Sequence, residues 1–246
     1  MKYSVVLFDL DGTLLDTLDD LWAAVNHALL SHGLPVRTRE EVRNFIGNGI
    51  VKLMERAVGE ERIHSVDMAG VMECFKEYYK AHCQDKTLPY EGVLNVLRAL
   101  RSQGTLIGVV SNKADFAVRQ LCEAYFGGLV NVAIGENEAG GVKKKPAPDT
   151  LFAALSKLSK LGVLEEFGAL GGIGGLAERN GEDIHRGKIP LSSVVYVGDS
   201  EVDIQTAENA GVDCVSVTWG MKSRAFLQKN GATVLVDRAE ELLEIL

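Results

Sequence analysis

The sequence predicts an α/β protein, a doubly wound parallel sheet into which an all-helical segment is inserted. Three observations support this prediction. Short, Val-rich apolar runs recur along the chain and stop at polar turns, which is typical of strands that are buried on both faces of a sheet. Helical patterns separate these runs, as expected for parallel strands joined by crossover helices. Residues 17–86 break the alternation, because they are helix-like and contain no good strand pattern.

The strand candidates are short runs of β-branched and aromatic residues that end at polar residues. The clearest is 3–9, Tyr-Ser-Val-Val-Leu-Phe-Asp, which leads directly into a turn. By the same signs we expect strands at 106–110, 130–134, 194–197, 214–217 and 234–236, and helices at 91–103, 114–125, 149–161, 202–210, 222–229 and 238–245.

The helical block is expected to form a cap over the sheet. The domain prediction is therefore a core made of 1–16 and 87–246 and a cap made of 17–86, with linkers at 14–17 and 85–89. Within the cap, helices are predicted at 20–32, 38–46, 49–58 and 61–84.

Residues 163–192 are predicted to be an atypical Gly-rich insertion within the core. They form a connection far longer than the few residues that usually join a helix to a strand. Gly172-x-Gly174-x-x-Ala177 is similar to a dinucleotide-binding loop, but that fingerprint needs a preceding strand, and 164–169 is not a convincing one. We therefore interpret the segment as a flexible surface insertion.

Composition limits the class of protein. The 246 residues are 46% hydrophobic and 24% charged, as in soluble globular proteins, and the net charge of −8 does not favour nucleic acid or anionic membranes as partners. No apolar run approaches the roughly 18 residues of a membrane span. Asp9 interrupts the first apolar run, unlike in a signal peptide. We expect a cytoplasmic monomer or homodimer whose four separated cysteines are reduced.

The strongest chemical signal is Asp9-Leu10-Asp11-Gly12-Thr13, which follows the first strand. Sites in open α/β sheets form outside the carboxyl ends of the strands. Two carboxylates there repel each other unless a cation pairs with them, and Mg²⁺ prefers oxygen ligands. The motif therefore predicts a divalent-metal site.

Three further motifs are expected at the same edge. Asp199 follows the strand at 194–197 and is placed to complete the metal site, while Asp203 lies in the next helix. Ser111-Asn112 ends another strand and offers a hydroxyl and backbone N–H groups to an anion. Lys145 is followed by Pro-Ala-Pro, and prolines restrict the backbone in a way that could aim the lysine inward.

In this order, Asp-x-Asp-Gly-Thr, Ser, Lys-Pro-x-Pro-Asp and Gly-Asp-Ser-x-x-Asp resemble the motifs of the haloacid dehalogenase superfamily. The sequence is most similar to the phosphoglycolate phosphatase-like branch, which has a Rossmann-like core and a helical cap. The resemblance covers nearly all of the chain except 163–192.

The resemblance implies a role for each matching residue. Asp9 would be the nucleophile that forms an aspartyl-phosphate, and Asp11 the general acid and base. Mg²⁺ would be bound by the Asp9 side chain, the Asp11 carbonyl and Asp199. The remaining assignments give Ser111, Asn112 and Lys145 to the phosphoryl oxygens and Asp203 to positioning Lys145 or a metal-bound water, with Gly12 and Thr13 in support.

Other branches of the superfamily fit less well. The dehalogenases lack the second acid, which Asp11 supplies here. Mutase-like members carry a cap histidine where this chain has Leu21, and phosphonatases use a cap lysine, for which Lys52 is the candidate. We interpret Lys52 as a solvated helix residue.

The cap is expected to select the substrate. Its segment Asn-Phe-Ile-Gly-Asn-Gly at 44–49 resembles the cap loop of phosphoglycolate phosphatases, and Gly47 and Gly49 would let substrate approach the backbone. Arg43 is the candidate partner of a substrate carboxylate, because a guanidinium matches a carboxylate fork. Trp219 would either border the entrance or pack.

The sequence thus predicts a Mg²⁺-dependent phosphatase of a small phosphorylated metabolite, with 2-phosphoglycolate as the favoured substrate. Sugar phosphates, nucleoside monophosphates and pyrophosphate are alternatives. A catalytically weak relative that acts by binding or regulation is the alternative from another class.

Overall fold

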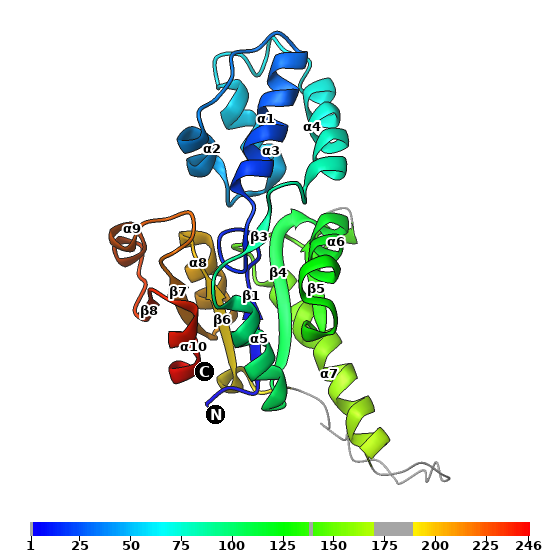
Figure 1. The fold of residues 1–246 in the computed structure, drawn as a ribbon, viewed down its shortest axis with the longest axis vertical. Helices are drawn as coiled ribbons and strands as arrows, with labels where there is room; N and C mark the ends of the chain where they lie inside the picture. The colour runs from blue at the N-terminus through cyan, green and yellow to red at the C-terminus, as the bar shows by residue number, and fades with distance from the viewer. Residues whose placement is uncertain (1, 138–139, 170–188) are drawn as a thin grey trace.

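A computed structural model describes residues 2–137, 140–169 and 189–246 of the chain. Its main element is a parallel six-stranded sheet in the order β5-β4-β1-β6-β7-β8. The sheet has helices on both faces and a group of helices beyond one end (Figure 1). Its strands are β1 (Val5–Phe8), β4 (Leu106–Ala114), β5 (Val132–Glu136), β6 (Val194–Gly198), β7 (Asp213–Val217) and β8 (Leu235–Val236).

Successive side chains of β1 point to opposite faces of the sheet and therefore pack in two different hydrophobic cores. Val6 and Phe8 pack on one face with residues of α5, α6 and α10, while Val5 and Leu7 pack on the other with residues of α7 and α8. This two-sided burial confirms the predicted doubly wound fold. The helices that follow the strands are α5 (Val93–Ser102), α6 (Asp115–Phe126), α7 (Asp149–Ala169), α8 (Glu201–Ala210), α9 (Arg224–Lys229) and α10 (Leu242–Ile245).

Four helices, which we call the cap, lie together beyond the carboxyl ends of the strands (Figure 1). Apolar residues of α1 and α4 form much of the cap interior. The predicted helix at 61–84 begins later, because Asp67 accepts a hydrogen bond from the Gly70 N–H at 3.1 Å and caps α4. The cap helices are α1 (Leu18–Ser31), α2 (Arg39–Phe45), α3 (Gly49–Val58) and α4 (Met68–His82).

The two chain crossings between cap and sheet form a small antiparallel pair, β2 (Leu15–Asp16) and β3 (Leu88–Pro89). The sequence predicts plain linkers here, since strands of two residues leave no pattern. Asp20 in α1 also accepts hydrogen bonds from the N–H groups of Lys86 and Thr87, at 3.0 and 2.9 Å. The crossings are therefore tied together at the base of the cap.

Two further differences concern segment ends. Strand β4 continues to Ala114 instead of stopping at Ser111-Asn112, so residues 111–114 extend the sheet beneath the cap. Helix α7 continues to Ala169 and includes the first residues of the expected insertion. Residues 170–188 of that insertion lie outside the described residues, and its last residues enter a 3-10 helix at Leu191–Ser193. In the part of the chain that the structure describes, no helix combines the length and the apolar character that a bilayer crossing requires.

Candidate active site

Asp9 lies directly after β1, in the turn at the carboxyl end of the sheet. The side chain is buried, and its Oδ1 accepts a hydrogen bond from Lys145 Nζ at 2.8 Å. Gly12 closes the turn with a φ of +88°, and a Cβ at this position would collide with the Asp199 carboxylate. Glycine is required there because the turn brings the first motif against the motif that follows β6.

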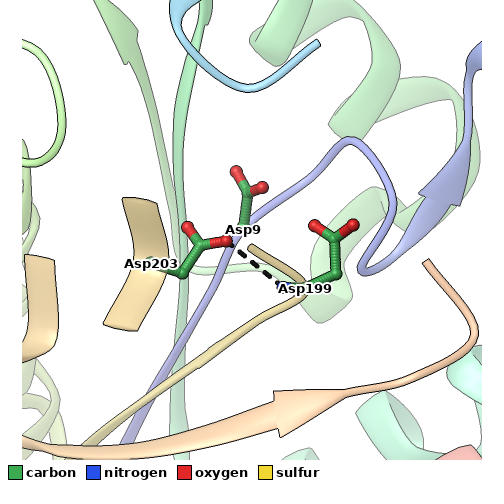
Figure 2. Close-up of side chains that lie close together, drawn as sticks. All are labelled: Asp9, Asp199 and Asp203. Carbon is green, nitrogen blue, oxygen red and sulfur yellow. Dashed lines mark hydrogen bonds between the residues drawn. The ribbon is translucent and has the colours of Figure 1, made fainter. Parts of the chain in front are cut away.

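Asp199 lies after β6 and is buried beside the first motif. Its Oδ2 accepts from the Met221 N–H at 2.5 Å, and its Oδ1 from the Thr13 hydroxyl at 3.4 Å. Figure 2 shows Asp9, Asp199 and Asp203 converging. One carboxylate oxygen from each of the three lies within 4.8 Å of the others.

Asp203 lies in the first turn of α8, where it both caps the helix and orients a lysine. Its Oδ2 accepts from the Ser200 hydroxyl at 2.6 Å and from the Asp199 N–H at 3.2 Å. Its Oδ1 accepts from Lys145 Nζ at 2.7 Å and from the Tyr196 hydroxyl at 3.1 Å. Each oxygen of Asp203 thus accepts from at least two donors of the chain, whereas each oxygen of Asp199 accepts from one and, among the described residues, Asp9 accepts only at Oδ1. Asp9 and Asp199 are therefore better able to offer an oxygen to a cation.

Lys145 turns inward and is buried, with its Nζ between Asp9 and Asp203. The Tyr196 hydroxyl accepts a third hydrogen bond from it at 2.9 Å. Sequence reasoning treated Tyr196 as a core residue of a strand and missed this contact. The peptide bond from Lys145 to Pro146 is cis.

Asn112 holds Lys145 through its side chain. Its amide accepts from the Lys145 N–H at 2.7 Å and donates to the Lys145 carbonyl at 3.0 Å and to the Gly47 carbonyl at 3.1 Å. Asn112 therefore connects β4 with both the Lys145 loop and the cap. Ser111 is buried beside it, and its Oγ accepts from the Lys113 N–H at 3.3 Å. The expected contacts of Ser111 and Asn112 with phosphoryl oxygens remain predictions.

Lys113 is a site residue that sequence reasoning missed. Its side chain is buried, and its Nζ lies 2.9 Å from Asp11 Oδ1 and 3.1 Å from Oδ2. Thr17, which directly precedes α1, donates to the same Asp11 Oδ1 at 2.6 Å. Asp11 is therefore held by one residue of β4 and one at the start of the cap.

The buried charges perturb one another strongly. Burial raises the pKa of Asp9 to about 7, although the attraction of Lys145 opposes this rise. Burial likewise holds the pKa of Asp199 well above its ordinary value, and the nearby Asp203 carboxylate adds to the effect. For Lys145, burial disfavours the ammonium, but Asp203 and Asp9 outweigh it and hold its pKa above the ordinary value.

The residues present fit a divalent cation. Among the described residues, four carboxylates, on Asp9, Asp11, Asp199 and Asp203, face two buried ammonium groups, on Lys113 and Lys145. With all six ionised, the cluster has two negative charges in excess, which a single divalent ion would cancel. Carboxylate and carbonyl oxygens are also the ligands that Mg²⁺ accepts.

A cavity lies between this cluster and the cap. Its wall includes the charged residues Asp9, Asp11, Lys113 and Lys145, and on the cap side Gly47 and Gly49, both with positive φ. The remaining lining residues are Leu21, Ile46, Ile50, Leu53, Ser111, Asn112, Asp199, Ser200, Met221 and Lys222.

Three cap and loop candidates lie elsewhere. The Arg43 guanidinium donates to the carbonyls of Gly220 and Met221, at 2.8 and 3.0 Å, and does not line the cavity. Its expected role as the partner of a substrate carboxylate remains a prediction, and in this structure it joins α2 to the loop after β7. Trp219 Nε1 donates to the Thr13 carbonyl at 3.0 Å. Lys52 is exposed and pairs with Glu55.

Comparison with known proteins defines the class of protein. A family model described as haloacid dehalogenase-like hydrolase matches residues 6–165, and a second, HAD-hydrolase-like, matches residues 142–242. The chain belongs to the haloacid dehalogenase-like hydrolase family, as the motifs indicated.

Several individual proteins are similar to the chain over nearly all of its length. The chain is 31% identical to the phosphoglycolate phosphatase of Pseudomonas fluorescens, over 97% of this chain and 78% of that protein. It is 27% identical to the N-acetylmuramic acid 6-phosphate phosphatase of Pseudomonas aeruginosa, over 100% and 96%. A crystal structure from Lactobacillus delbrueckii, assigned as a phosphoglycolate phosphatase, has a TM-score of 0.78 and 38% identity and covers 100% of this chain and 98% of its own.

Proposed function

We propose that the protein is a phosphatase that hydrolyses the phosphate monoester of a small metabolite, with 2-phosphoglycolate as the favoured substrate. The observation that carries the proposal is the convergence of Asp9 and Asp199, which follow β1 and β6, with Asp203 of α8 and Lys145 of the segment after β5. Phosphoryl transfer depends mainly on alignment and charge stabilisation, which such a cluster provides. The phosphoglycolate phosphatases among the relatives support the choice of substrate.

Mg²⁺ is the proposed cofactor, held by the Asp9 side chain, the Asp11 carbonyl and Asp199. When bound, the ion would supply positive charge beside the phosphoryl oxygens and offset the repulsion between a substrate dianion and the carboxylates. Both oxygens of Asp203 accept hydrogen bonds from donors of the chain, so this residue supports Lys145.

Asp9 is the proposed nucleophile. Lys145 donates to its Oδ1, so we assign the attack on phosphorus to Oδ2. The new oxygen–phosphorus bond forms as the ester P–O bond breaks, and Asp11, which must be protonated for this step, gives its proton to the departing alkoxide. Asp11 then takes a proton from the water that attacks the aspartyl-phosphate, which releases inorganic phosphate and restores Asp9.

The transferring phosphoryl group needs donors for its oxygens. We assign this role to the Ser111 hydroxyl, the Asn112 backbone N–H and Lys145, which all line the cavity. Asp203 and the Asn112 side chain would fix Lys145 from two directions, through its ammonium and through its backbone. Lys145 therefore would not have to reorganise as negative charge develops.

The test is phosphate release from a panel of esters, measured with Mg²⁺ and with EDTA. The panel contains 2-phosphoglycolate, sugar phosphates, nucleoside monophosphates and pyrophosphate. We expect metal-dependent release that is fastest from 2-phosphoglycolate and absent in Asp9→Asn. Release that persists in purified Asp9→Asn would contradict the mechanism. No release from any ester would favour the binding or regulatory alternative.

A sugar phosphate is the second candidate substrate. The N-acetylmuramic acid 6-phosphate phosphatase aligns with the entire chain and with 96% of its own length, a fuller overlap than the 78% of the Pseudomonas fluorescens protein. The panel separates the two candidates directly. Preference for a sugar phosphate would keep the mechanism and change the substrate.

The cytoplasm is the proposed compartment. All four cysteines are free thiols in the structure, including the buried Cys83 and Cys122, and free thiols persist in a reducing environment. The proposal of a cytoplasmic metabolic enzyme also fits a small phosphorylated substrate.

A further inference from the structure

The cavity contains a second buried cation besides Lys145. Strand β4 extends beneath the cap and carries Lys113, which is only 5% exposed and lines the cavity. A buried ammonium is costly unless it is paired, so its position calls for an anion nearby. In this structure that anion is Asp11.

The two lysines face different partners. Lys145 is engaged by Asp9 and Asp203, at the centre of the proposed phosphoryl chemistry. Lys113 instead contacts Asp11 and the cap, where its Nζ lies 4.7 Å from the centroid of the Tyr79 ring. One cation therefore serves the nucleophile side of the cavity and the other serves the leaving-group side.

The partner of Lys113 is the residue that must move toward the reacting bond. In the proposed function, Asp11 gives its proton to the leaving oxygen, while here its carboxylate is held by Lys113 and Thr17. When Asp11 turns to the ester, Lys113 loses a counter-ion. A negative group on the substrate, close to the ester oxygen, would replace it.

The Tyr79 hydroxyl points to the same conclusion from the cap side. It is buried next to Lys113 and makes no hydrogen bond of good geometry within the described part of the chain. Buried hydroxyl groups normally find a partner. Leu21 and Ile50, which line the main cavity, also line an apolar hollow beside it that contains both Tyr79 and Lys113. Lys113 thus lies at the border between the main cavity and the hollow that Tyr79 lines.

We propose that Lys113 determines the specificity of the site by binding a carboxylate on the leaving group of the substrate. The proposal rests on the proposed phosphatase function and names the substrate class as phosphate esters of 2-hydroxy acids. Asp11 sets the distance, because the carboxylate must reach Lys113 while the ester oxygen reaches Asp11. Arg43, whose guanidinium binds two backbone carbonyls, is not required for this recognition.

The experiment compares 2-phosphoglycolate with its uncharged amide, 2-phosphoglycolamide. We expect kcat/KM of the wild-type enzyme with Mg²⁺ to be about 100-fold higher for the acid, since sites built for one polar partner reject analogues that lack it. In Lys113→Gln the ratio of the two kcat/KM values should fall to about one, because the acid can no longer form the ion pair that the amide lacks. Lys113→Arg keeps the charge and should retain part of the preference.

Lys222→Gln is the matched control. Lys222 also lines the cavity, but it is more exposed and its Nζ lies 5.6 Å from the centroid of the Phe226 ring. This variant should keep the preference for the acid. Loss of the preference in Lys222→Gln but not in Lys113→Gln would overturn the proposal.

A binding measurement makes the test independent of turnover. Calorimetry with Asp9→Asn and Mg²⁺ should show tighter binding of the acid than of the amide, and Asp9→Asn/Lys113→Gln should show no difference. Equal affinities in Asp9→Asn, or an acid preference that survives in the double variant, would overturn the proposal. Failure of the wild type to release phosphate from any ester would contradict the proposed function instead, and the binding measurement would still decide the role of Lys113.

Discussion

Lys113 Nζ lies 2.9 Å from Oδ1 of Asp11, so the second carboxylate of the first motif is ion-paired with a residue of β4. Asp9, the first carboxylate, is paired with Lys145 at 2.8 Å. Each acid of the motif thus has its own lysine, delivered by a different segment. The two acids nevertheless differ, since Asp9 lies in the crowded acidic cluster and Asp11 accepts a hydrogen bond from Thr17 at the start of the cap.

This difference predicts opposite effects on stability for two inactive variants. Asp9→Asn and Asp11→Asn should both abolish turnover. Without metal at pH 8, Asp9→Asn should leave the free energy of unfolding unchanged or increase it, because it removes one of several like charges. Asp11→Asn should decrease it by about 1–3 kcal/mol, because Lys113 loses its carboxylate. Urea unfolding measures both, and equal losses would contradict the separate pairing.

We expect the effect of Mg²⁺ on the stability of the folded protein to depend on pH. The pKa of Asp9 is raised to about 7 in the folded protein, against 3.8 for the ordinary group, and that of Asp199 is also raised. The folded state therefore binds more protons than the unfolded state, and the contribution of these groups to stability falls as pH rises from about 4 through 7.

The expected outcome is a Mg²⁺ effect that grows with pH. Mg²⁺ binds the ionised carboxylates, so it should raise Tm more at pH 8 than at pH 5. Thermal unfolding in EDTA and in Mg²⁺ at several pH values checks this. Asp199→Asn serves as the control and should weaken the Mg²⁺ effect. A shift of Tm that is independent of pH would argue against binding at these carboxylates.

Asp203 should contribute far more to the free energy of unfolding than an acidic residue at the surface. Its ion pair with Lys145 is almost fully buried, with side-chain exposures of 1% and 3%. Removing one partner of such a pair leaves an uncompensated charge, and Asp203→Ala should cost about 3–5 kcal/mol. Asp213, which pairs with Lys2 at 57% and 65% exposure, is the control, and Asp213→Ala should cost less than about 1 kcal/mol. Denaturant midpoints compare the two, and similar costs would contradict the structural role of Asp203.

Much of the site could be predicted because its residues follow strand ends. Parallel strands place their carboxyl ends at one edge, so Asp9 and Asp199, which follow β1 and β6, had to meet once the strands were recognised. The sheet itself was recognisable from runs such as Val194–Gly198, which are apolar throughout.

Lys113 and Tyr196 escaped prediction for physical reasons. A lysine after Ser111-Asn112 is ordinarily solvated, and its burial here depends on Tyr79, which a different part of the fold supplies. Tyr196 lies within an apolar strand, where nothing local shows that its hydroxyl reaches Lys145. The pairing of β2 with β3 depends on two distant crossings of the chain, and two-residue strands have no periodicity.

Arg43 provides the last prediction, because its contacts in this structure join the cap to the loop after β7. It joins α2 to the carbonyls of Gly220 and Met221, and the Met221 N–H in turn donates to Asp199. Arg43→Gln should therefore loosen the cap and the loop together and lower kcat/KM about equally, by roughly tenfold, for 2-phosphoglycolate and its amide. Arg39→Gln is the control, since Arg39 pairs with Asp19 within the exposed part of the cap. The test is kcat/KM for both esters. If Arg43 bound the substrate carboxylate, Arg43→Gln would lower activity toward the acid alone.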